Sequence, residues 1–152
     1  MDSPRTRTRY TARMGEGNTE VFQGQYLLQQ DGDIVFIRPE GDLPLDAGHR
    51  LLERLLRVKK EHGRCFIVAN LEQAGSIPPK TRRLLVEYGT KHRPDAIALC
   101  CAGLLARTMN ALLFGAINLL GKQPQNTKQF ETEQEGRIWI ASERQRLIQT
   151  ST

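Results

Sequence analysis

The chain has 152 residues, of which 39% are hydrophobic and 26% charged, so it can bury one core and is too apolar for wholesale disorder. Its net charge of +5 is concentrated at the N-terminus, where residues 1–14 carry +3 and leave +2 for residues 15–152. This distribution argues against a nucleic-acid surface on the folded part of the chain.

Residues 1–20 are predicted to form a disordered basic arm, because they contain no apolar segment that could be buried. Such an arm is a solvated tail, or it contacts an anionic membrane or a nucleic acid. No apolar run follows it, which indicates that there is no secretory signal and predicts a cytoplasmic protein. The basic residues of the arm are Arg5, Arg7, Arg9 and Arg13.

Cysteine and histidine spacing predicts neither a disulfide framework nor a metal site. Cys65, Cys100 and Cys101 lie in or beside apolar runs and lack C-x-x-C spacing, which is typical of buried thiols in a reducing compartment. The histidines have no second ligand at metal-binding spacing. We therefore expect no metal and no cofactor.

The first elements are a hairpin, a helix and a buried strand. Two β-rich runs, "FQGQYLLQQ" and "DIVFIRPEG", flank Asp31-Gly32, a dipeptide typical of tight hairpin turns. An amphipathic helix follows, with Asp46 as the expected N-cap and Gly63 as the expected stop. The run "CFIVANL" is apolar on both faces, which is typical of a central strand covered by helices on both sides.

The next segment, "AGSIPPKTRR", raises the question of what Ser76 does. A serine just before a helix is a typical N-cap, so Ser76 is interpreted first as the cap of the helix "TRRLLVEYG", which we expect to end at Gly89. The same position also favours a phosphate, since negative charge is stabilised at a helix N-terminus. Ser76 is therefore the phosphorylation candidate of the sequence.

The remaining elements are the strand "AIALCCAG", a helix over residues 104–120, the edge strand "TKQF" and a C-terminal helix. Thr132 and Glu135 form a capping box for this last helix, whose Ile138, Trp139 and Leu147 are expected to face inward. The order β-β-α-β-α-β-α-β-α predicts an α/β fold, with a mixed, mostly parallel five-stranded sheet flanked by about four helices. We assign the domain to residues 21–148 and a short tail to 149–152.

The helix over residues 104–120 has no charge after Arg107. At about 100° per residue, a broad leucine-rich arc is expected to dock on the sheet, which leaves Phe114 on the outer face. That face suggests contact with an apolar ligand or an anionic membrane; the alternatives are packing against a neighbouring helix, or a homodimer or partner surface. The docking arc is Leu105, Met109, Leu112, Leu113, Ala116, Leu119 and Leu120; the contact candidates are Arg107, Asn110, Phe114, Asn118 and Lys122.

Over residues 22–145 the sequence resembles the STAS superfamily, and most closely its SpoIIAA-like branch. The resemblance lies in "GDIVFIRPEGDL", "FIVANLEQAGSIPP", "AIALCCAGLLARTMNALL" and "KQFETEQEGRIWI". It implies a small, non-enzymatic regulatory domain in which a serine at the position of Ser76 is phosphorylated, although the classical Asp-Ser-Ser-Gly motif is replaced here by Gly75-Ser76-Ile77-Pro78-Pro79. The branch is also similar in layout to the lipid-carrying CRAL-TRIO domains.

No phosphate loop of the G-x-x-x-x-G-K-[ST] type and no G-x-S-x-G elbow occurs, so we expect no enzymatic activity. The leading hypothesis is a cytoplasmic STAS-type interaction module with a regulatory protein partner. It would also contact a hydrophobic ligand or the membrane surface through the helix over residues 104–120. The alternatives are a carrier or sensor of lipids, and a nucleic-acid-associated regulator that uses the basic arm.

Overall fold

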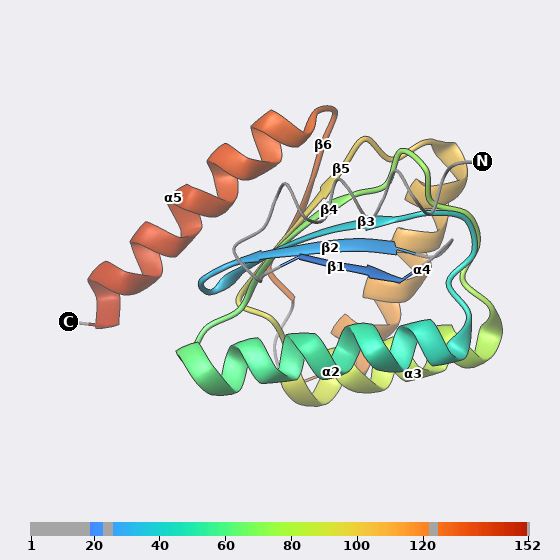
Figure 1. Cartoon of the computed structure of the whole chain (residues 1–152), viewed down its shortest axis with the longest axis horizontal. Helices are drawn as coiled ribbons and strands as arrows, with labels where there is room; N and C mark the ends of the chain where they lie inside the picture. Colours follow the sequence, from blue (N-terminus) through green and yellow to red (C-terminus); the bar gives the residue numbers. More distant parts are fainter. Residues whose placement is uncertain (1–18, 23–25, 122–124, 152) are drawn as a thin grey trace.

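The computed structural model describes residues 19–22, 26–121 and 125–151, which form one α/β sandwich (Figure 1). The described strands lie side by side in chain order, from β1 to β6. They are β1 (Thr19–Phe22), β2 (Tyr26–Asp31), β3 (Ile34–Pro39), β4 (Phe66–Asn70), β5 (Ala96–Cys100) and β6 (Thr127–Phe130). The helices are α2 (Leu45–His62), α3 (Pro79–His92), α4 (Leu104–Leu120) and α5 (Glu133–Ser151).

The expected fold class is confirmed, and the structure adds one strand to it. β1, β2 and β3 pair antiparallel, whereas β3, β4, β5 and β6 pair parallel. Gly32 has a φ of +62° in the β2–β3 turn, a conformation that glycine adopts without a steric cost. β1 begins at Thr19, inside the segment expected to be the arm, and α5 continues to Ser151 through most of the expected tail.

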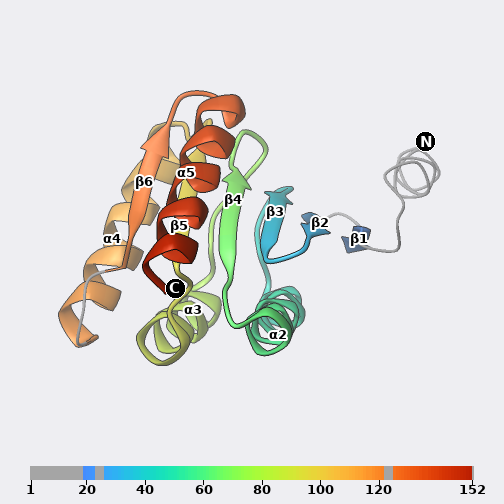
Figure 2. The same cartoon turned by 90° about the vertical axis from the view of Figure 1, so that its left-hand side faces the viewer.

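The sheet has two unequally covered faces (Figure 2). α2, α3 and α4 cover one face, where Ile67, Ala69, Ile97 and Leu99 belong to the larger core. Among the described elements, α5 is the one helix on the other face, and its Ile140 packs in a smaller cluster with residues such as Phe66, Val68, Ala98 and Cys100. Both faces of β4 and β5 are buried, as their unbroken apolar runs predicted.

Several local expectations hold and others are wrong. Gly63 ends α2 with a φ of 75°, and Thr132 and Glu135 exchange the two hydrogen bonds of a capping box. Asp46 lies in the first turn of α2 rather than at the N-cap, which is Pro44. Ile138 is 61% exposed instead of facing inward.

Gly89 is an interior residue of α3 and not its end. A Cβ atom at this position would lie 2.5 Å from Ile117 Cδ1, so the glycine lets α4 approach α3 closely. This contact fixes how α4 is rotated about its own axis.

Candidate functional site

Ser76 does not cap α3. The helix begins at Pro79, its N-cap residue is Pro78, and no side chain makes a capping hydrogen bond. An N-cap side chain accepts from the N–H of the second or third helical residue; for Ser76 these would be Pro78 and Pro79, which have no N–H. The two prolines therefore exclude the cap for a reason that is visible in the sequence.

Ser76 instead binds the loop that follows β3. Its Oγ donates to Asp42 Oδ1 at 3.0 Å, and its backbone N–H donates to the same oxygen at 2.8 Å. The loops after β3 and β4 also pair through their backbones, with Gly75 N–H donating to the Gly41 carbonyl. A Cβ atom on Gly75 would lie 2.5 Å from Asp42 Oδ1, so only glycine permits this approach.

The structure turns α4 about its axis relative to the expected orientation, so that each expected face is only partly right. Asn110, Leu113 and Ile117 are buried, and Phe114 packs against the larger core, so Phe114 is not an exposed contact residue. The helix is apolar on nearly every side, and for this reason the sequence pattern could not show which side faces the sheet. The contact between Ile117 and Gly89 decides it.

The other contact candidates on α4 do not form a common site. Arg107 is exposed, and its Nε donates to the Ala102 carbonyl at 3.1 Å. Asn118 is exposed and accepts a hydrogen bond from the Gln125 N–H at 2.9 Å. Lys122 and the four arginines of the basic arm lie outside the described residues.

The outer surface of α4, which we call the leucine face, consists of leucines that, apart from Leu104, were expected to dock on the sheet. Leu104 is 84% exposed, Leu119 83% and Leu112 60%. Leu105, Leu112 and Leu119 recur at intervals of seven residues, so they project from one side of the helix. The leucine face comprises Leu104, Leu105, Leu112, Leu119 and Leu120.

α3 and α4 enclose an open groove of about 680 Å³ beside the leucine face. The α4 wall is apolar, and the α3 wall carries the cations Arg82, Arg83 and Lys91. Lys91 forms an ion pair with Glu87 at 3.4 Å, whereas the described residues give no ion-pair partner to Arg82 or Arg83. Arg82 Nε is buried and has no hydrogen-bond partner in the part of the chain that the structure describes. The α4 residues that line the groove are Leu112, Leu113, Ala116 and Leu120.

A second, smaller cavity of about 50 Å³ lies at the carboxyl ends of β3 and β4. It is lined by apolar side chains together with Ser76 and Asn110. The Nδ2 atom of Asn110 is buried and has no hydrogen-bond partner in the described structure. This cavity is too small for a lipid or a nucleotide.

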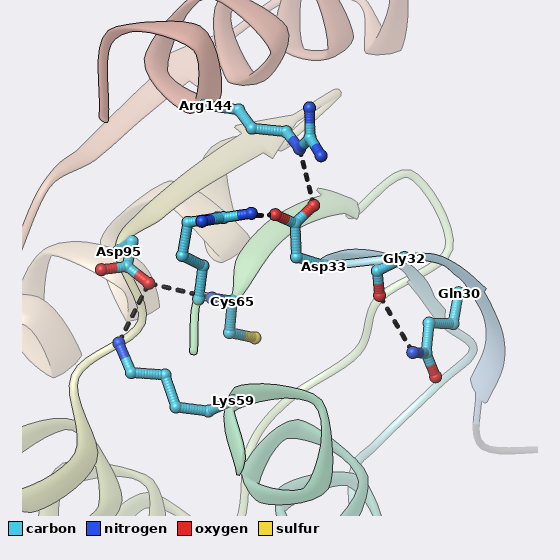
Figure 3. A network of polar contacts seen from close by, with 8 residues as sticks. Gln30, Gly32, Asp33, Lys59, Cys65, Asp95 and Arg144 are labelled. Atoms are coloured by element: carbon cyan, nitrogen blue, oxygen red, sulfur yellow. Dashed lines mark hydrogen bonds and ion pairs between the residues drawn. The ribbon is translucent and has the colours of Figure 1, made fainter. Parts of the chain in front are cut away.

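A polar network lies at the opposite end of the sheet, where the parallel strands begin (Figure 3). Asp33 binds Arg64 at 2.9 Å and Arg144 at 2.7 Å, and Asp95 binds both Lys59 and the backbone N–H of Cys65. Burial alone would raise the pKa of Asp33, but the hydrogen bonds and charges of the two arginines outweigh it and lower the pKa. Every acid here is paired with cations, which indicates a structural role.

The buried thiols are not poised for nucleophilic chemistry. Burial raises the pKa of Cys65 to about 12 and that of Cys100 to about 12. A thiol with such a pKa stays protonated and unreactive near neutral pH. Within the described ranges, no group of three or more His, Cys, Asp or Glu side chains could hold a metal ion.

Comparison with known proteins identifies the fold. Among solved structures, the chain is similar to an uncharacterised DUF3478-family protein from Shewanella loihica PV-4 that has a SpoIIAA-like fold. The TM-score is 0.57 at 14% sequence identity, and the similarity covers 82% of this chain and 99% of that chain. No protein-family model and no curated protein matches the sequence. The protein thus has a SpoIIAA-like fold, as the sequence resemblance implied.

The sequence analysis did not find the leucine face, nor Arg82 and Arg83 of the groove, which have no ion-pair partner among the described residues. The signal for the leucine face was present, because a helix that is apolar all round exposes apolar side chains whichever way it docks. Arg82 and Arg83 follow Ser76 closely in the sequence, and nothing in that stretch indicates that they line a groove with α4. In the described part of the chain, no helix combines the length and the apolar character needed to cross a bilayer.

Proposed function

We propose that the protein is a non-enzymatic interaction module of the STAS type that docks on an anionic membrane surface through the leucine face of α4. The exposure of these leucines is the observation that carries the proposal. Monomeric proteins rarely leave a contiguous surface of large apolar side chains in water, and such surfaces are typical of interaction sites. Burying one leucine contributes about 1.5–3 kcal/mol.

The charges that flank the leucine face favour an anionic lipid surface as the partner. α3 carries Lys80, Arg82, Arg83 and Lys91 against Glu87, and Arg107 lies on α4 itself. A basic side chain near an anionic membrane contributes about 1 kcal/mol, and this attraction adds to the burial of the leucines. An acidic membrane surface therefore complements both features of this side of the molecule.

Vesicle co-sedimentation tests the proposal with a matched pair of variants. Leu105→Asp/Leu112→Asp removes two leucines of the face, whereas Ile138→Asp changes a side chain of equal exposure on α5, across the sheet. We expect the wild type to pellet with phosphatidylglycerol vesicles and the double variant to bind at least about 30-fold more weakly, since each lost leucine contact costs roughly a factor of ten. The Ile138→Asp variant should pellet like the wild type. Equal pelleting of all three proteins contradicts the proposal.

A second candidate function is a phosphorylation switch at Ser76. Its hydroxyl is partly exposed and its contact is with the carboxylate of Asp42. A phosphate on Ser76 would repel that carboxylate and separate the paired loops after β3 and β4. Phosphopeptide mass spectrometry of protein from its native cells tests this switch, and the absence of phosphate at Ser76 in every growth condition contradicts it.

A further inference from the structure

We propose that the groove between α3 and α4 binds one anionic lipid molecule, with an acyl chain along α4 and the headgroup at Arg82 and Arg83. The inference rests on the proposed membrane docking, and it names the ligand that the docked protein holds. The groove volume of about 680 Å³ lies within the usual range of small-molecule sites, which is about 300–1,000 Å³.

The two walls of the groove match the two parts of such a lipid. Leu112, Leu113, Ala116 and Leu120 give α4 an apolar wall suited to a hydrocarbon chain, and Val86 of α3 continues it. The opposite wall carries guanidinium groups, whose planar forks of N–H donors suit phosphate oxygens. A ligand that is apolar at one end and anionic at the other fits both walls.

Arg82 and Arg83 are the cations that a headgroup would meet. Lys91, at the far end of α3, already has Glu87 as an ion-pair partner. Arg82 and Arg83 have no such partner among the described residues, and the Nε of Arg82 is buried without a hydrogen bond. A buried donor without an acceptor is unfavourable, so we infer that the Arg82 side chain, which lines the groove, turns toward a phosphate there and donates to its oxygens.

Variants of the arginines separate a headgroup site from general electrostatic attraction. Arg82→Gln/Arg83→Gln removes two charges from the groove, and Arg57→Gln/Lys60→Gln removes two exposed charges from α2, which α3 separates from α4 (Figure 2). If binding depended only on general attraction to an anionic surface, both double variants would lose the same amount of binding. If the groove holds a specific headgroup site, the Arg82→Gln/Arg83→Gln variant loses far more binding than the Arg57→Gln/Lys60→Gln variant.

The groove itself is tested with lipid monomers. Lysophosphatidylglycerol below its critical micelle concentration should bind with one molecule per chain by calorimetry, and inorganic phosphate and lysophosphatidylcholine should bind much more weakly. We expect Arg82→Gln/Arg83→Gln to weaken monomer binding at least about 30-fold, and the α2 pair less than about threefold. Ala116→Phe, which fills the groove from the α4 wall, should abolish monomer binding while the leucine face still binds vesicles.

The outcomes separate this inference from the docking on which it rests. Vesicle binding without monomer binding overturns the groove assignment and leaves docking in place. Equal monomer affinity in the groove variant and the α2 variant also overturns it. Monomer binding without vesicle binding supports the groove and contradicts docking. Circular dichroism of each variant confirms that the helices are retained, so that a loss of binding reports on the site.

Discussion

Asp33 Oδ1 accepts a hydrogen bond from Arg144 Nε at 2.7 Å, which joins the residue before β3 to α5 across 111 positions of sequence. The carboxylate of Asp33 is nearly inaccessible, and its other oxygen accepts from Arg64 Nε at 2.9 Å. The ion pair between Asp33 and Arg144 attaches α5 to the sheet face on which it is the one described helix. This ion pair therefore stabilises the packing of α5 on the sheet.

Asp33→Ala should destabilise the protein by about 2–3 kcal/mol. Removal of one member of a buried ion pair typically costs about 3–5 kcal/mol, and the partial exposure of both arginines reduces this figure. Urea unfolding measures the difference. A matched change of the exposed carboxylate Glu53→Ala should cost less than about 0.5 kcal/mol. Equal effects of the two changes would contradict a structural role for Asp33.

Stability should fall in acid because carboxylates with lowered pKa values must be protonated. The pKa of Asp33 in the folded protein lies below its usual value of 3.8. The ion pairs of Asp33 therefore contribute their full stability at pH values above 3.8, and this contribution is lost as the pH falls through the folded-state pKa. Glu133 behaves alike, since hydrogen bonds from Asn70 and Arg137 outweigh burial and lower its pKa. The melting temperature should fall between about pH 5 and pH 2, and less steeply in Asp33→Asn. An unchanged slope in this variant would contradict the assignment.

Asn110→Leu should stabilise the protein by about 1 kcal/mol. The change removes a buried amide donor that has no partner among the described residues, and puts an apolar side chain of similar size into a largely apolar cavity. Thermal unfolding measures the shift. A lower melting temperature would show that the amide is satisfied in solution.

Two glycine-to-alanine changes should have opposite signs. A Cβ atom on Gly136 of α5 would overlap Cys100 Sγ, whereas one on Gly115 of α4 would meet no atom within 4 Å. Gly115→Ala should stabilise by about 0.5–1 kcal/mol through helix propensity, and Gly136→Ala should destabilise by about 1–3 kcal/mol. Denaturant unfolding compares them. Stabilisation by both changes would show that α5 does not pack this closely on β5.

The sequence predicted the sheet and most helix boundaries because these depend on local patterns. The short apolar runs before Asn70 and up to Cys100 are typical of covered strands, and Gly32, Gly63 and the Thr132–Glu135 pair mark turns and caps by their own chemistry. The added strand β1 escaped notice because it is short and is separated from β2 only by residues 23–25. β1 is a strand because it pairs with β2, and its composition alone does not indicate this.

The candidate site was harder to predict because it depends on contacts between distant elements. The rotation of α4 follows from the fit of Ile117 against Gly89, and no pattern within an apolar helix reveals it. Likewise, Arg82 and Arg83 belong to a groove only because α4 lies beside α3. The interpretation of Ser76 as a cap is different, since Pro78 and Pro79 already excluded it.

Hydrogen exchange of the intact chain with and without phosphatidylglycerol vesicles tests the membrane-docking proposal most directly. Vesicles should slow amide exchange in α4 and the adjoining α3, and leave α5, on the opposite face of the sheet, unchanged. Protection that is absent from α4, or that appears on α5 instead, would contradict docking through the leucine face.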